Sequence, residues 1–273
     1  VCYDGTEFYG WQVQPGTRTV QGELQEAITQ LTGERRTVVA AGRTDAGVHA
    51  LGQVCHFRTN AATPASRIGP ALRPHLPPDL SVLDGADVPA GFHSTRDAVS
   101  KTYRYVYWND VHPNPLARRF AWRVRPDARG RGLDADAMRD AAARIVGTHD
   151  FACFQSAGSP RPDTVRTMHR LTLTRSAVWP AWSSVPFEER NENDGPLLIL
   201  EVTGDGFLYN MVRSIAGTLA EVGMGKRPAD ELRELIASRD RTLAGPTAPP
   251  QGLYMVRVDY EDDQGRTVGV PSS

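Results

Sequence analysis

The chain has 273 residues, of which 40% are hydrophobic, and a formal net charge of −1 at pH 7. This length and composition fit one large domain or two domains of ordinary size, and the near-zero charge argues against binding to nucleic acid through overall charge alone. No stretch approaches the roughly 18 consecutive apolar residues that a membrane helix needs, so we expect no membrane-spanning segment.

The first hundred residues predict short strands around one amphipathic helix. Residues 1–3 read as the end of a strand, and a helix is expected from Thr19 or Val20 to Leu31, where apolar residues recur at i, i+3, i+4 and i+7. Gly33 suits the end of this helix. Further strands are expected at 37–40, 52–59 and, more weakly, 81–88, with a short helix at 68–76.

Four aromatic residues lie close together near the start of the chain: Tyr3, Phe8, Tyr9 and Trp11. Such a group forms either part of the core or a surface on which nucleic-acid bases stack. The local pattern favours core.

The remainder of the chain predicts longer strands and more apolar helices. Residues 102–108 alternate as in a strand, with tyrosines on one face and Arg104, Val106 and Trp108 on the other. The polar stretch Ser176–Pro196 has no periodicity and reads as an excursion from the fold. Strands are also expected at 169–174, 197–202 and 253–260, and helices at 134–146, 207–222 and 229–238.

The order of these elements predicts an α+β fold. Strands and helices do not follow the regular βαβα rhythm of a doubly wound sheet, so we expect a mostly antiparallel sheet with helices on one face. Two similar halves that meet near residue 100 fit the length, although they share no visible sequence repeat. We therefore expect an N-terminal half over residues 1–98, a C-terminal half over 99–262 and a disordered tail over 263–273.

The cysteines and histidines indicate neither a metal site nor disulfide bonds. The three cysteines are far apart and odd in number, and the seven histidines form no ligand cluster. We therefore expect reduced, buried cysteines and a cytoplasmic protein. The chain also opens inside an expected strand without a Met, which suggests that further residues precede Val1.

Positive charge is carried almost entirely by arginine and is concentrated in one segment. Lys101 and Lys226 are the only lysines, and the stretch from Lys101 to Arg131 is rich in arginine, with Asp110 and Asp127 as its only acidic residues. A neutral chain with such a segment can present a local phosphate-binding face. The alternative is a high arginine content scattered over the surface.

The turn expected at residues 42–47 is a candidate site. It contains Gly42 and Gly47, which allow unusual backbone angles or close approach, together with Arg43 and Asp45. One interpretation is a functional carboxylate near a guanidinium. The other is a structural loop with a surface ion pair, and the local pattern does not decide between them.

The helix expected at 207–222 carries an arginine beside its apolar face. Arg213 lies along a stripe of small residues, where another element can approach closely. A guanidinium in that place is partly buried and needs an anionic partner, either a catalytic group or the substrate. The alternative is an arginine that reaches solvent at the helix edge.

Three separated stretches resemble motifs of the tRNA pseudouridine synthase A family. They are Ala41–His49, Tyr103–Tyr105 and Phe207–Arg213. Two further parts of the chain resemble the opening and the close of the family: Tyr3–Thr6 with Gly10–Gln12, and Ala248 with Gly252–Tyr254. The resemblance runs from about residue 1 to residue 260, and its first motif is long and specific.

The resemblance implies isomerisation of uridine to pseudouridine at positions 38, 39 and 40 in the anticodon stem-loop of tRNA. It implies two similar α/β halves around a continuous, mostly antiparallel sheet with a central cleft, a homodimer, and no cofactor. Asp45 matches the essential carboxylate of the family, and Tyr103 and Arg213 match its other catalytic positions. Arg43, Tyr103 and Arg104 match positions expected to contact the substrate.

A carboxylate, a tyrosine and two arginines are residue types that pseudouridine formation can use. The reaction breaks the N1–C1′ bond, turns the uracil and joins C5 to C1′, so it needs a carboxylate that attacks the nucleoside or stabilises positive charge at C1′. We expect Asp45 in that role, kept ionised by Arg213. Tyr103 would stack on the base, and Arg43 would fill the space left by the flipped nucleotide or hold its phosphate.

Two other classes of function compete with this interpretation. A non-catalytic RNA-binding or tRNA-folding module on the same scaffold would have no use for Asp45 together with Arg213. An unrelated carboxylate enzyme would act on free nucleosides or glycosides. The sequence departs from the family at Ser214, where Asn is more usual, and in the length of Ser176–Pro196.

Overall fold

The computed structural model describes residues 1–156, 158, 163–177, 179, 195–261 and 267–269, and it divides into two compact units. The first comprises Val1–Lys101 and Tyr254–Ser273, and the second Thr102–Leu253. This differs from the expected halves, because the last long strand returns to the first unit. That strand, β11 (Leu253–Glu261), pairs in parallel with β3 (His49–Ala50), and pairing so distant in sequence leaves no local signal.

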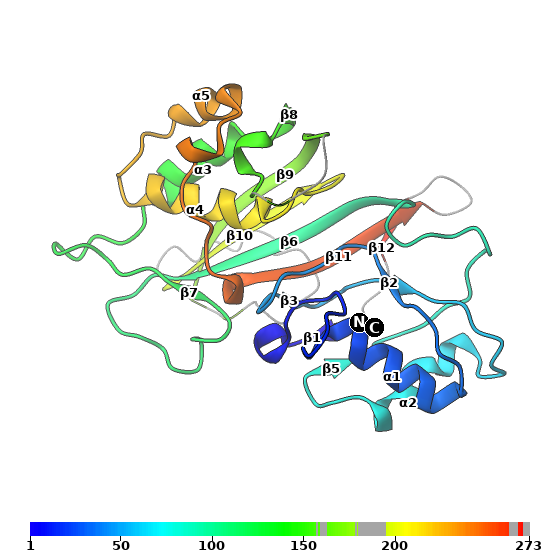
Figure 1. Ribbon diagram of the computed structural model, residues 1–273. Helices are drawn as coiled ribbons and strands as arrows, with labels where there is room; N and C mark the ends of the chain where they lie inside the picture. Colours follow the sequence, from blue (N-terminus) through cyan, green and yellow to red (C-terminus); the bar gives the residue numbers. More distant parts are fainter. Residues whose placement is uncertain (157, 159–162, 178, 180–194, 262–266, 270–273) are drawn as a thin grey trace. The chain divides into compact units, whose positions relative to one another are not determined.

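The sheet of the first unit combines three strands of two residues with the long strand β11 (Figure 1). Its order is β5 (Leu80–Ser81), β1 (Cys2–Tyr3), β3 and β11, and β1 is antiparallel to both of its neighbours. A fifth strand, β12 (Thr267–Gly269), pairs antiparallel with β11, which corrects the expected disorder for that part of the tail. Residues 270–273 lie outside the described residues.

Two strands of the first unit are shorter than the sequence predicts. The stretches 37–40 and 52–59 are reduced to β2 (Val39–Ala40) and β4 (Cys55–His56), which pair with each other in a separate two-stranded sheet. At the start of 52–59, the N–H groups of Leu51 and Gly52 both donate to the carbonyl of Met255, so a regular ladder does not begin there.

Helix α1 (Val20–Thr32) confirms the prediction from periodicity. The Thr19 side chain accepts a hydrogen bond from the N–H of Gly22, and Gly33 ends the helix with a φ of +74° and a hydrogen bond to the carbonyl of Thr29. The buried side of α1 includes Leu24, Ala27 and Ile28. The expected helix at 68–76 is a single short helix, α2 (Ile68–Leu72), followed by a 3-10 turn at Arg73–His75.

The second unit has a sheet with helices on one face (Figure 1). The sheet order is β6 (Ala98–Trp108), β10 (Leu197–Gly204), β9 (Val165–Ser176) and β8 (Gly147–Asp150), with β7 (Trp122–Arg123) parallel to the end of β6. Strand β9 is antiparallel to both of its neighbours, β8 and β10. The expected α+β class with mostly antiparallel pairing is confirmed.

Three helices cover this sheet: α3 (Ala135–Ala143), α4 (Met211–Gly223) and α5 (Glu231–Ser238). Helix α4 is almost wholly buried, as expected from its composition, but it begins four residues later than the expected start at Phe207. The delay follows from Asn210, whose φ of +59° is incompatible with a right-handed helix. Among the described residues no helix has the length and apolarity to cross a membrane.

Most of the expected excursion at Ser176–Pro196 lies outside the described residues, namely 178 and 180–194. The parts that flank it belong to the sheet. Ser176 is the last residue of β9, and Pro196 precedes β10, so the stretch connects two strands that pair with each other.

Candidate active site

Asp45 lies in a tight turn between β2 and β3. Its carbonyl accepts a hydrogen bond of 3.1 Å from the N–H of Val48, and Gly47 has a φ of +79°, which glycine adopts at little cost. Within this turn Thr44 is buried, Asp45 is half-buried and Arg43 is exposed. The glycine predicted to shape the loop therefore does so, and the carboxylate-bearing residue keeps access to solvent.

The N-terminal stretch holds this turn from the same unit. The Tyr3 hydroxyl and the Thr44 Oγ1 are 2.8 Å apart, and the N–H of Trp11 donates to the Thr44 carbonyl at 3.0 Å. On the other side of Asp45, the N–H of Gly47 donates to the carbonyl of Phe8 at 3.3 Å. Burial raises the pKa of Tyr3 to about 12, so its hydroxyl stays neutral at physiological pH. The backbone around Asp45 is thus fixed on both sides, which a positioned catalytic group requires.

Gly10 is the point of closest approach between this stretch and the turn. It has a φ of +82°, and a Cβ added there would lie 2.8 Å from the Thr44 carbonyl oxygen and 3.1 Å from the Asp45 carbonyl carbon. Gly16 has a similar φ of +72°, but a Cβ added there would meet nothing within 4 Å. The two glycines therefore share the backbone requirement and differ in the space around them.

We expect Gly10→Ala to lower the free energy of unfolding by about 1–3 kcal/mol more than Gly16→Ala, because only the first forces the backbone of the turn to move. Chemical denaturation of both variants measures the difference. Equal losses would mean that the positive φ alone requires glycine at residue 10 and that the turn tolerates a methyl group against it.

In the second unit, Tyr103 lies on β6 next to the start of the third motif. Its side chain is 7% exposed, and its ring meets that of Phe207 edge to face, with centroids 4.9 Å apart and planes at 76°. The structure therefore brings together the second and third motifs of the resemblance. Asp45 and Arg43 belong to the other unit.

Arg213 lies in the first turn of α4 and is half-buried, as the sequence predicts. Its Nε donates to the carbonyl of Ala248 at 2.8 Å, and one of its terminal nitrogens donates to the Asn210 Oδ1 at 2.8 Å. The N–H of Ala248 in turn donates to the Arg213 carbonyl at 3.0 Å. Both acceptors are neutral, so these contacts orient the guanidinium without cancelling its charge. Such directed bonding disfavours the alternative of a solvent-reaching arginine.

Arg104 is not placed as expected. Its side chain is completely buried in the second unit, and its Nε and one terminal nitrogen donate to the same Glu201 Oε1 at 2.8 and 2.6 Å. An RNA cannot reach a side chain without exposed surface, so the expected substrate contact is corrected to a structural ion pair. The sequence held one part of the signal, because Glu201 is the one charged residue in the apolar strand β10.

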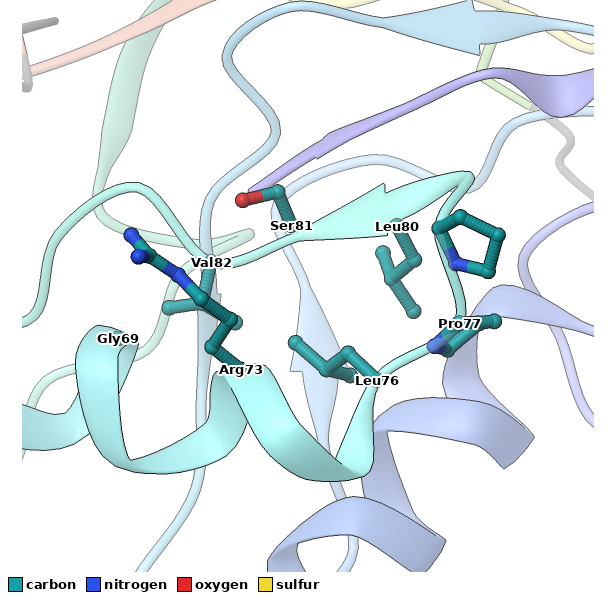
Figure 2. Close-up of a pocket in the computed structure, with 8 residues that line it drawn as sticks. Gly69, Arg73, Leu76, Pro77, Leu80, Ser81 and Val82 are labelled. Atoms are coloured by element: carbon teal, nitrogen blue, oxygen red, sulfur yellow. The ribbon is translucent and has the colours of Figure 1, made fainter.

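A small cavity lies elsewhere in the first unit. Figure 2 shows it between α2 and β5, with Leu76 and Leu80 among the residues around it and a volume of about 210 Å³. Arg73 is the only charged residue in its lining, which includes neither Asp45 nor Arg43. We therefore assign the candidate site to the Asp45 turn and not to this cavity. In the part of the chain that the structure describes, no three His, Cys, Asp or Glu side chains gather as metal ligands would.

A firmly held turn that presents a carboxylate, on a mostly antiparallel α+β scaffold, agrees with the class of enzyme that the motifs resemble. The chain matches the model of a tRNA pseudouridine synthase family over residues 1–107 and 141–261. It therefore belongs to this family, which confirms the resemblance stated from its motifs.

Three similar proteins carry the same name, tRNA pseudouridine synthase A. The tRNA pseudouridine synthase A of Thermoanaerobacter sp. (strain X514) is 41% identical over 260 residues, covering 95% of this chain and 97% of that protein. The enzyme of the same name from Bacillus pumilus (strain SAFR-032) is 44% identical over 264 residues, covering 96% and 98%. That of Acetivibrio thermocellus is 42% identical over 258 residues, covering 94% and 96%.

Proposed function

We propose that this protein is a tRNA pseudouridine synthase that isomerises uridine to pseudouridine in the anticodon stem-loop of tRNA, at positions 38, 39 and 40. The observation that carries the proposal is the match to the family along both units, together with Asp45 on the firmly held turn of the first motif. The isomerisation consumes no water and transfers no electrons to another molecule. It therefore depends on groups that handle the glycosidic bond and the released base.

Asp45 is the essential carboxylate in this proposal. It attacks C1′ or C6, or it stabilises positive charge at C1′ while the N1–C1′ bond breaks. The uracil then turns, C5 bonds to C1′, and any bond between Asp45 and the nucleoside breaks, which restores the carboxylate. The proton on C5 leaves, and N1 gains a proton. Support comes from the turn itself: the neighbours Thr44 and Gly47 are tied to the N-terminal stretch, while the Asp45 side chain stays accessible.

Tyr103 and Arg213 complete the proposed catalytic set. Tyr103 stacks on the uracil and takes part in moving its proton, and Arg213 supplies a positive charge that favours the ionised form of Asp45. The contacts of Arg213 with Ala248 and Asn210 support this role, because they hold the guanidinium in a fixed orientation. Arg104 is left out of the substrate contacts because it is buried against Glu201.

Arg43 handles the flipped nucleotide. A uridine in a folded RNA must leave its stack to reach a catalytic carboxylate, at a cost of a few kcal/mol. An exposed arginine two residues from Asp45 is suited to fill the vacated space or to hold the adjacent phosphate. No other residue of the turn carries a positive charge.

The segment from Lys101 to Arg131 supplies further contacts to RNA phosphates. Arg118, Arg125 and Arg129 are exposed, while Asp127 is engaged with Arg131 at 2.7 Å. A Pro115 carbonyl accepts a hydrogen bond from Arg118 at 2.8 Å, which keeps that guanidinium on the surface of its loop. Arginines that meet phosphates and 2′-hydroxyls give shape recognition of RNA.

The remaining parts of the proposal follow the family resemblance. We propose a homodimer without a cofactor, located in the cytoplasm. All three cysteines are free, which supports a reducing compartment.

The test is to incubate the protein with unmodified tRNA transcripts and to map pseudouridine along them. We expect new pseudouridine at positions 38 to 40 and nowhere else in the transcript. An RNA-binding module would bind the transcripts and leave every uridine unchanged, and an enzyme for free nucleosides would turn over uridine and ignore RNA. Either result would overturn the proposed function.

A further inference from the structure

One of the four aromatic residues near the start of the chain is not part of the core. Tyr3, Phe8 and Trp11 are 1–3% exposed, and the ring of Tyr3 lies 6.3 Å from that of Phe8 and 6.5 Å from that of Trp11. Tyr9 is 59% exposed. The core interpretation of this group is therefore confirmed for three members and wrong for the fourth.

The position of Tyr9 connects it to the Asp45 turn. The residue before it, Phe8, accepts a hydrogen bond from Gly47, and the residue after it, Gly10, packs its backbone against Thr44 and Asp45. Tyr9 is thus the single exposed residue between two that contact the turn. A lone exposed aromatic residue is ordinary, but Tyr9 lies between two residues whose backbone contacts the turn of a proposed catalytic carboxylate, which brings it close to where the substrate must bind.

The backbone of Tyr9 is also held rigidly. Its N–H donates to the carbonyl of Arg18 at 2.8 Å. Arg18 is bound by both oxygens of Asp79 at 2.7 Å and by Glu23 at 2.8 Å, and its guanidinium lies 4.2 Å from the centre of the Phe8 ring. An aromatic side chain on a fixed backbone loses little conformational entropy when it binds.

We propose that Tyr9 stacks on a base of the tRNA that neighbours the target uridine. This inference rests on the proposed function. When the uridine flips out, the base beside it loses a stacking partner, and an exposed aromatic ring next to the site replaces it. Stacking of this kind accepts any base, because every base has an aromatic face. Tyr9 therefore aids every target position rather than reading one sequence.

The experiment compares Tyr9→Ala, Tyr9→Phe and the intact protein on one tRNA transcript, with Leu83→Ala as control. Leu83 is a 45% exposed apolar residue of the same unit, and it follows β5 and not the N-terminal stretch that holds the turn. We expect Tyr9→Ala to raise the Kd for tRNA by about 5- to 150-fold, the range for loss of one stacked base. Tyr9→Phe and Leu83→Ala should stay within about twofold of the intact protein, since the Phe ring still stacks.

Salt dependence separates stacking from charge. The slope of log Kd against log salt should be the same for Tyr9→Ala and the intact protein. In Arg118→Ala the slope should fall by about 1, the contribution of one phosphate contact. An unchanged Kd in Tyr9→Ala, an equal loss in Tyr9→Phe, or a change of oligomeric state by sedimentation would overturn the inference. The intact protein would still form pseudouridine in each of these cases. If it formed none, the proposed function would fail instead.

Discussion

Replacing Asp45 by Asn should abolish pseudouridine formation while the protein still folds and binds tRNA. Asn has the shape of Asp but can neither attack the nucleoside nor stabilise positive charge at C1′. We expect the rate of pseudouridine formation to fall by about a thousandfold or more, the scale of loss when an essential catalytic group is removed. Single-turnover measurement of pseudouridine, with enzyme in excess over tRNA, reads the chemical step.

Asp87→Asn is the matched control for this experiment. Asp87 is an exposed aspartate of the same unit, so its replacement makes the same change in charge outside the turn. The Kd for tRNA should be similar in both variants, because the hydrogen bonds that hold the turn come from Thr44 and Gly47. Near-normal turnover by Asp45→Asn would remove Asp45 from the mechanism.

Removing Glu201 should destabilise the protein more than removing any surface carboxylate. Glu201→Ala leaves the guanidinium of Arg104 buried without this partner, and breaking a buried ion pair in this way costs about 3–5 kcal/mol. The free energy of unfolding, measured by denaturation in urea at neutral pH, gives the effect. The double variant Arg104→Met with Glu201→Leu should recover most of the loss, because it removes both buried charges.

The comparison for this prediction is Asp140→Ala. Asp140 pairs with Arg144 through two hydrogen bonds of 3.0 Å on α3, but its side chain is 56% exposed. An exposed pair of this spacing is worth about 0.2–1 kcal/mol. If Glu201→Ala cost no more than Asp140→Ala, water would have to reach Arg104, and a contact of that arginine with RNA would again be open.

Local patterns predicted the helices better than the strands. The four apolar positions of α1 and the glycine after it define the helix from within a dozen residues, so spacing alone located it. The strands of the first unit depend on partners far along the chain. Whether Leu51 and Gly52 extend a ladder is decided by Met255, which no local pattern around them contains.

The candidate site was predicted in part. The glycine turn was visible, but its function came from the family motif, because a carboxylate near an arginine has many uses. The positive φ of Asn210 was not predictable, since it is a rare conformation for a residue other than glycine and depends on its surroundings. The burial of Arg104 was not predictable from alternation, because residues 102–107 of β6 are buried on both faces of the strand.

The return of β11 to the first unit has a consequence for biosynthesis. During translation the ribosome releases the N-terminal residues first, and domains usually fold in that order. Here β3, which directly follows the Asp45 turn, pairs with Tyr254 and Met255, so its sheet is incomplete until those residues have emerged. The second unit, Thr102–Leu253, has by then been synthesised in full. The first unit, which contains Asp45, therefore completes its sheet after the second unit has been synthesised. The backbone around Asp45 reaches its final structure only near the end of synthesis.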